Sequence, residues 1–319
     1  MDSILTPVIL FILGLIIIIK GGDAFVDAAR WISEVTGIPK LIVGATIVSL
    51  ATTLPELFVS VIATRQGSIG IATGNAIGSV IANIGIGMSI GLIASPMIVD
   101  PKTFGPKAFL MIIISIALFI VGFDGKLSFL NSLILLALLG FYIYSNVMSA
   151  KQASIDAADD DKPSVTKNAV VTNLLKFALG ALGIIWGADL LVDNGQIIAA
   201  ALGVSEEIIG LTVIAIGTSL PELVTAFTSI AKKETSLSVG NIIGANIIDM
   251  SMILPVCSFV SAGGLEISRS TIMVDIPVAL FFMAIAVVPT MLAKKFRKWQ
   301  GYVILASYVG YLVYVVNFV

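Results

Sequence analysis

The chain of 319 residues contains no histidine and a single cysteine, Cys257. A lone cysteine excludes a disulfide within the chain, and the absence of histidine removes the side chain that most often carries protons at neutral pH. Soft transition metals prefer cysteine and histidine ligands, so a site for them is not expected. Charged residues make up only 12% of the chain, against about a quarter in soluble domains. A soluble globular protein is therefore excluded, and no nucleic-acid partner is expected.

Apolar residues are abundant instead, at 58% of the chain, with a mean hydropathy of +1.07. Windows long enough to cross a bilayer recur along the whole length. The first has neither a basic leader nor a cleavage site of small residues, so we expect a retained helix and not a signal peptide. The predicted fold class is an all-α membrane protein with ten transmembrane helices, at roughly 5–20, 41–64, 69–93, 108–122, 127–148, 170–188, 208–231, 237–259, 272–293 and 302–319.

An ungapped internal repeat is the strongest pattern in the sequence. TTLPE at 52–56 is matched 166 positions later by TSLPE at 218–222, and GNAIGSVIAN at 74–83 by GNIIGANIID at 240–249. Five helices in each half is an odd number, so the second half enters the membrane from the opposite side. We predict two inverted five-helix repeats, a common transporter plan, at 1–148 and 169–319. They are joined by a polar cytoplasmic linker at 149–168, whose acidic run lacks the central glycine and terminal glutamate of an EF-hand loop.

Basic residues are distributed unequally between the two sides that this topology defines. Fifteen lie in the loops and helix ends of one side, and only Arg65, Lys126 and Arg269 lie on the other. Because basic loops stay in the cytoplasm, we predict a multi-pass protein of the plasma membrane with both termini extracellular.

The second helix of each half contains a proline and a glutamate inside its apolar run. Thr53-Leu-Pro-Glu56 and Ser219-Leu-Pro-Glu222 have the spacing of a capping box, and proline is tolerated in a first helical turn but breaks an interior one. We therefore expect both central helices to break in mid-membrane and to leave backbone carbonyls without partners. A capped, kinked helix with no substrate role is the alternative, but two copies in corresponding positions favour a site.

The third helix of each half is predicted to pack closely and to present polar side chains. Gly74 and Gly78 have the GxxxG spacing of close helix contacts, as do their counterparts Gly240 and Gly244. Asn75 and Asn241 are expected to bond nearby backbone. Ser79 and Asn83 lie on one helix face because they are four residues apart, as do Ala245 and Asp249. An interfacial or structural role is expected for four further acids, Asp23, Asp27, Asp189 and Asp193.

The polar groups of these four helices are all oxygen ligands. Glu56, Glu222 and Asp249 have no lysine or arginine in the same helices, and an uncompensated buried charge is expensive. A bound Ca²⁺, which takes six to eight oxygens, or several Na⁺ would supply the counter-charge. Protons remain a third possibility.

The two motifs resemble the alpha-repeat signatures of the sodium/calcium exchanger family, in its prokaryotic form, within the Ca²⁺:cation antiporter superfamily. The resemblance covers nearly the whole chain. It implies four central helices lining the ion sites, with the first helix of each half sliding to switch access. It also implies that Glu56 and Glu222 are the central calcium ligands. The remaining ligands implied are the side chains of Thr53, Ser219, Ser79, Asn83 and Asp249 and the backbone carbonyls of Ser49, Thr52, Ala215 and Thr218.

Three positions depart from the family pattern. Thr53 stands where serine is commoner, and Ala245 stands where many members have the hydroxyl that matches Ser79. One Na⁺ site would therefore lack a side-chain ligand. Asp249 is opposed by Asn83, and the potassium-dependent branch also has aspartate there. The signatures of the proton-coupled branch are absent.

We expect a secondary antiporter that extrudes Ca²⁺ in exchange for Na⁺ by alternating access. The ions are substrates and not cofactors, the bilayer is the partner, and no oligomer is required. Proton/Ca²⁺ antiport and potassium-dependent exchange are the alternatives within transport. A passive channel predicts flux without counter-ion dependence. An intramembrane enzyme would leave the inverted repeat unexplained, and we expect no enzymatic activity.

Overall fold

The structure, a computed structural model, describes residues 2–156, 166–201, 217, 219–261 and 263–318. Within these ranges the chain is almost entirely helical. Two short strands, β1 (Lys126–Leu127) and β2 (Leu265–Glu266), pair in antiparallel fashion. The predicted fold class, a helical membrane protein, is therefore confirmed.

The first half contains ten helical segments, five of them short. They are α1 (Asp2–Thr36), α2 (Lys40–Val43), η1 (Gly44–Val48), α3 (Ser49–Thr52), α4 (Leu54–Arg65), α5 (Ile69–Ala82), η2 (Asn83–Met88), α6 (Ser89–Ala94), α7 (Pro101–Val121) and α8 (Phe129–Asp156). The described part of the second half comprises α9 (Lys167–Ala201), α12 (Leu220–Ala231), α13 (Thr235–Ile248), η5 (Asp249–Ile253), α14 (Leu254–Val260), η6 (Thr271–Asp275), α15 (Ile276–Ala293) and α16 (Lys298–Phe318). The η segments are single π-helical turns inside longer helices.

Seven continuous helices in the described ranges are long and apolar enough to span a bilayer, and the bent α2–α4 segment makes eight. Helix α16 and the short apolar α12 complete the described set. The predicted span at 208–231 is represented mainly by α12, because residues 208–216 lie outside the described residues. The count of ten spans and the division at 148 and 169 therefore stay predictions.

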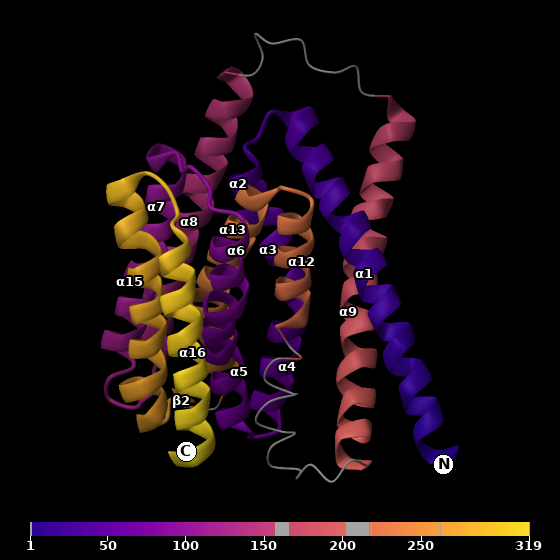
Figure 1. The fold of residues 1–319 in the computed structure, drawn as a ribbon. Helices are drawn as coiled ribbons and strands as arrows, with labels where there is room; N and C mark the ends of the chain where they lie inside the picture. Colours follow the sequence, from indigo (N-terminus) through magenta and orange to yellow (C-terminus); the bar gives the residue numbers. More distant parts are fainter. Residues whose placement is uncertain (1, 157–165, 202–216, 218, 262, 319) are drawn as a thin grey trace.

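The third helix of each half lies at the centre of the molecule, and the first lies at its edge. About four fifths of the apolar window is buried in Ile69–Ala94 and in Thr235–Val260, at 78% and 83%. For α1 and α9 the corresponding shares are 22% and 11%. These two long helices pack against each other along one side of the helical core (Figure 1).

Both chain ends lie at one end of the molecule, while α8 ends and α9 begins at the opposite end (Figure 1). The β1–β2 ribbon, which contains Lys126, lies at the end of the termini. This arrangement is the one that inverted halves require. We call the two ends the terminus end and the linker end.

The first helix of each half is longer than predicted. Helix α1 continues to Thr36 and α9 to Ala201, past the predicted ends at 20 and 188. Charged residues do not interrupt a helix, and in the first half the next stop signals are Gly37, at a left-handed φ of 73°, and Pro39. The aspartates predicted to lie at the edge of the apolar core are therefore helical residues.

Candidate ion-binding site

The second helix of the first half bends at its proline. Segments α2–α3 and α4 meet at 41°, and Pro55 has no N–H to offer the carbonyl of Ala51. Thr53 nevertheless keeps a right-handed conformation, with φ −85° and ψ −3°. Its N–H bonds the Ser49 carbonyl at 3.0 Å, and its own carbonyl accepts the Leu57 N–H at 3.2 Å. The predicted break is thus a sharp kink with part of the helical ladder retained.

The capping boxes predicted at these two positions are wrong. Thr53 and Ser219 do occupy the N-cap positions of α4 and α12, but neither side chain caps its helix. The helical conformation at Thr53 turns its hydroxyl back to the Ser49 carbonyl, which accepts it at 2.6 Å. Glu56 and Glu222 are consequently free of a capping role.

Three buried carboxylates are the central feature of the site. Glu56, Glu222 and Asp249 are each 1% exposed. None of their six oxygens has a hydrogen-bond partner in the part of the chain that the structure describes. They lie close enough for mutual electrostatic repulsion, and no described lysine or arginine pairs with them. Anions held in this way require a positive charge from outside the chain.

Two buried hydroxyls from opposite halves meet at the start of α12. Ser219, at the start of α12, donates to Ser79 of α5 at 2.9 Å. The repeat places Ala245 and Thr53 at the matching positions of the other copy, where alanine offers no oxygen. The Thr53 hydroxyl donates to the Ser49 carbonyl of its own helix.

The amide of Asn83 is held by a residue that the sequence analysis did not single out. Its Nδ2 donates to Oδ1 of Asn246 at 3.1 Å, and its own Oδ1 has no partner among the described residues. That free oxygen is available to a cation. Asn246 could have been found from its place one turn before Asp249 in a helix without charged neighbours.

The two asparagines at matching positions of the repeat, Asn75 and Asn241, differ in their contacts. Asn75 donates to the Glu56 carbonyl at 3.2 Å and to Ser60 at 2.9 Å, as expected for a backbone-bonding role. Asn241 instead accepts the hydroxyl of Thr52 at 3.3 Å, so its predicted bond to nearby backbone is wrong. Ala226 stands where the other copy has Ser60, and the hydroxyl that Asn75 uses is therefore missing.

Nine of the eleven residues predicted to form the site are described, and all nine are buried: Ser49, Thr52, Thr53, Glu56, Ser79, Asn83, Ser219, Glu222 and Asp249. Ala215 and Thr218 lie outside the described residues. The Ser49 carbonyl accepts the Thr53 N–H and the hydroxyls of Thr52 and Thr53. To bind a cation it would have to release at least one of these donors.

Glycines bring the two halves together at the centre. A Cβ on Gly240 would lie 2.2 Å from the Leu41 carbonyl oxygen, and one on Gly244 would lie 2.4 Å from the Ser49 hydroxyl. This confirms their predicted packing role. Among the described residues nothing lies within 4 Å of a Cβ on Gly74 or Gly78. The repeat would place residues 207–215 against them, and these lie outside the described residues, so the packing role of Gly74 and Gly78 stays a prediction.

π-Helical turns begin at the two candidate ligands of the third helices. Turn η2 starts at Asn83, and turn η5 starts at Asp249. The positions correspond in the repeat, and such turns often occur at functional sites.

The donor set is suited to a hard cation, because every free side-chain atom named at the centre is oxygen. Within the described ranges no three Asp, Glu, Cys or His side chains converge on one metal position. A cation bound here would therefore draw on hydroxyl, amide and carbonyl oxygens beside its carboxylates.

Comparison with known proteins gives matches over nearly the whole chain. The family model described as "Sodium/calcium exchanger protein" matches residues 6–148 and 172–317. An uncharacterized membrane protein of Methanocaldococcus jannaschii is 33% identical, over 94% of each chain. A sodium/calcium exchanger of Methanosarcina acetivorans is 26% identical, over 96% of this chain and 97% of its own. The solved structure of the sodium-calcium exchanger NCX_Mj superposes with a TM-score of 0.85 at 30% identity, covering 99% of this chain and all of that one. The chain therefore belongs to the sodium/calcium exchanger family.

Proposed function

We propose that the protein exchanges Na⁺ for Ca²⁺ across the plasma membrane by alternating access and thereby extrudes Ca²⁺. The observation that carries the proposal is the set of three buried carboxylates without described partners, contributed by both halves of a duplicated membrane fold. One Ca²⁺, or several Na⁺ in its place, neutralises this charge. Each ion can then leave the site only when the other replaces it, which is the basis of obligatory exchange.

The burial of the described residues and the family pattern support the following ligand assignment. Glu56 and Glu222 lie in the first turns of α4 and α12, directly after the prolines, and we assign them to Ca²⁺. Asp249, the free oxygen of Asn83 and the hydroxyls of Ser79, Ser219 and Thr53 complete the cation sites. The backbone carbonyls proposed to join them are those of Ser49, Thr52, Ala215 and Thr218.

Two alternatives concern the coupling ion. A buried carboxylate takes up a proton as readily as it binds Na⁺, so proton/Ca²⁺ antiport uses the same groups. Asp249 is shared with the potassium-dependent branch, which favours a test for a K⁺ requirement. All three readings predict an exchanger and not a channel.

Calcium uptake into proteoliposomes distinguishes these possibilities. Vesicles loaded in turn with Na⁺, with K⁺, with both ions or with a proton gradient are diluted into ⁴⁵Ca²⁺. We expect uptake only from vesicles that contain Na⁺, without a need for K⁺. Uptake driven by protons alone would replace the proposed coupling, and uptake without any counter-ion would indicate a channel.

The proposed orientation places both termini outside the cell, as the distribution of basic residues predicts. Single cysteines introduced in the 149–168 linker and near the C-terminus of a Cys257→Ala protein test it. In intact cells an impermeant thiol reagent should label only the C-terminal cysteine. Labelling of both positions from one side would refute the inverted plan.

A further inference from the structure

Helices α1 and α9 pack closely against each other as a unit at the edge of the molecule. A Cβ on Gly180 would lie 2.7 Å from the backbone nitrogen of Phe25, so the two helices are in close backbone contact. Their buried side chains, among them Ile18 and Ile184, belong to the smaller of two apolar clusters, which also takes in Val43, Val48 and Leu237 of the helices beside them. We call this unit the α1–α9 pair.

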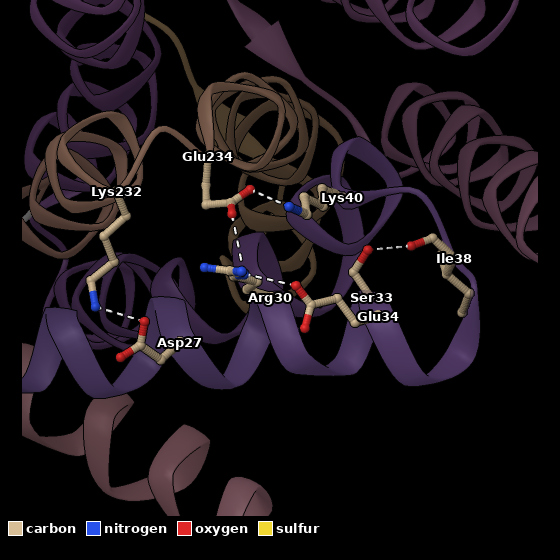
Figure 2. A network of polar contacts seen from close by, with 8 residues as sticks. All are labelled: Asp27, Arg30, Ser33, Glu34, Ile38, Lys40, Lys232 and Glu234. Atoms are coloured by element: carbon tan, nitrogen blue, oxygen red, sulfur yellow. Dashed lines mark hydrogen bonds and ion pairs between the residues drawn. The ribbon is translucent and has the colours of Figure 1, made fainter. Parts of the chain in front are cut away.

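Ion pairs join the α1–α9 pair to the core at the linker end (Figure 2). Lys232, at the end of α12, lies 2.7 Å from Asp27 and 3.5 Å from Asp23 of α1. Buried Glu234, in the turn before α13, lies 3.4 Å from Arg30 of α1. Lys40 holds the same glutamate from the core side, at 2.6 Å.

The matching end of the other copy lacks these contacts. The repeat aligns Lys232 with Gln66, so no cation stands opposite Asp189 and Asp193 of α9. Among the described residues neither aspartate has an ion pair. There α9 borders a cavity of about 220 Å³, lined also by Val59 of α4 and by Pro55 and Pro221 beside the two glutamates. Helix α1, by contrast, packs directly against α12.

A track of polar side chains leads from the carboxylate site toward the linker end. Thr225 and Ser229 follow Glu222 on the same side of α12, and both are fully buried. Neither hydroxyl has a hydrogen-bond partner in the described part of the chain. The Ser229 carbonyl accepts the N–H of Glu234 at 2.7 Å. The track thus ends directly beneath the ion pairs.

We propose that the ion pairs joining α1 to the α12–α13 turn are a closed gate, and that Thr225 and Ser229 line the ion pathway behind it. The cation Lys232, which the other copy replaces with Gln66, gives the protein a built-in preference for being open at the terminus end. This inference rests on the proposed alternating access, because a gate that never opens has no function in exchange. Alternate opening then requires Lys232 and Glu234 to release α1.

Cysteine accessibility measures the state of the gate without measuring transport. A Ser229→Cys reporter in a Cys257→Ala protein is exposed to an impermeant thiol reagent from the linker side, with no ion gradient. Lys232→Gln, which copies the residue of the other repeat, should raise the modification rate about two- to five-fold, the range expected for a half-exposed ion pair. Arg30→Gln should act in the same direction. The matched control is Lys233→Gln, which removes an equal charge one residue away.

The reciprocal variant tests the asymmetry itself. Gln66→Lys supplies the missing cation opposite Asp189 and Asp193. A Val59→Cys reporter, which lines the cavity, should then be modified more slowly from the terminus side, again by about two- to five-fold.

The gate is refuted if neither Lys232→Gln nor Arg30→Gln changes the Ser229→Cys rate, or if Lys233→Gln raises it equally. The exchange assay is scored separately on the same proteoliposomes. Normal Na⁺/Ca²⁺ exchange with an unchanged reporter overturns the gate and leaves the proposed function intact. A reporter that shifts as expected in a protein without Na⁺/Ca²⁺ exchange supports the gate and overturns the proposed function.

Discussion

Substitution of Ala245 by serine should strengthen the dependence of exchange on Na⁺. In one copy of the repeat the buried Ser79 and Ser219 hydroxyls form a 2.9 Å pair. In the other copy the matching positions are Ala245 and Thr53, and the threonine hydroxyl is turned to the Ser49 carbonyl. Ala245→Ser supplies the missing oxygen on the helix face that carries Asp249.

The expected size of the effect follows from one polar contact. A neutral hydrogen-bonding contact in a folded protein has a net value of about 1 kcal/mol, which corresponds to about a five-fold lower half-saturating Na⁺ concentration. The effect on Ca²⁺ should be smaller, because the two glutamates stay in place. Ala245 is fully buried, and an added atom in a packed core costs about 1–3 kcal/mol of stability. The variant should therefore melt at a lower temperature than the wild type.

The assay is ⁴⁵Ca²⁺ uptake into proteoliposomes over a range of internal Na⁺ concentrations, with Ser79→Ala as the reciprocal variant. Ser79→Ala should raise the half-saturating Na⁺ concentration. If Ala245→Ser and Ser79→Ala both leave the Na⁺ dependence unchanged in folded protein, these positions do not line the sodium sites. Proton coupling then becomes the better interpretation.

Three further outcomes are expected. Glu56→Gln and Glu222→Gln should abolish ⁴⁵Ca²⁺ exchange. Each should also raise the melting temperature measured without Ca²⁺, because each removes a buried, uncompensated charge. Normal exchange in both variants would refute the assigned ligands. Gly244→Leu should prevent folding, as judged by size-exclusion chromatography. Gly78→Leu should do the same if the repeat symmetry extends to residues 207–215, and a well-folded Gly78→Leu protein would contradict that symmetry. Asp100 caps α7, and the Thr103 hydroxyl and the Lys102 N–H lower its pKa. Its side chain is exposed, so Asp100→Ala should lower the free energy of unfolding by only about 0.5 kcal/mol. The difference should be present above the unfolded pKa of about 3.9 and disappear at lower pH, and identical pH profiles of melting would refute it.

The parts of the site that could be predicted are those that depend on composition and repetition. Glu56 and Glu222 are carboxylates in apolar runs without a basic neighbour, so their burial predicts that a cation or a proton from outside the chain neutralises them. Gly240 and Gly244 have a spacing that permits close approach, and the structure places backbone against both. These inferences need only local sequence and the expense of charge in an apolar medium.

The parts that could not be predicted depend on where a side chain turns once the helices have packed. Thr53 and Glu56 have the spacing of a capping box, but the residual helicity at the kink directs the threonine hydroxyl backward. Asn246 acquires its role from Asn83, which is 163 residues away in the chain. The length of α1 was underestimated because hydropathy marks the apolar part of a helix and not its hydrogen-bonded end.

The π turns at Asn83 and Asp249 impose a constraint on chain length that residue identity does not reveal. Each contains one residue more than an α-helical turn, and every residue in a helix rotates the chain by about 100°. Loss of a single residue between Asp249 and Ile253 would restore regular hydrogen bonding at little local expense. The same loss would rotate everything on one side of it by that angle, so that the Gly240–Gly244 face and the segment α14 could not both keep their neighbours. In this part of the molecule the number of residues matters as much as their identity, and an insertion or deletion would be more harmful than most substitutions.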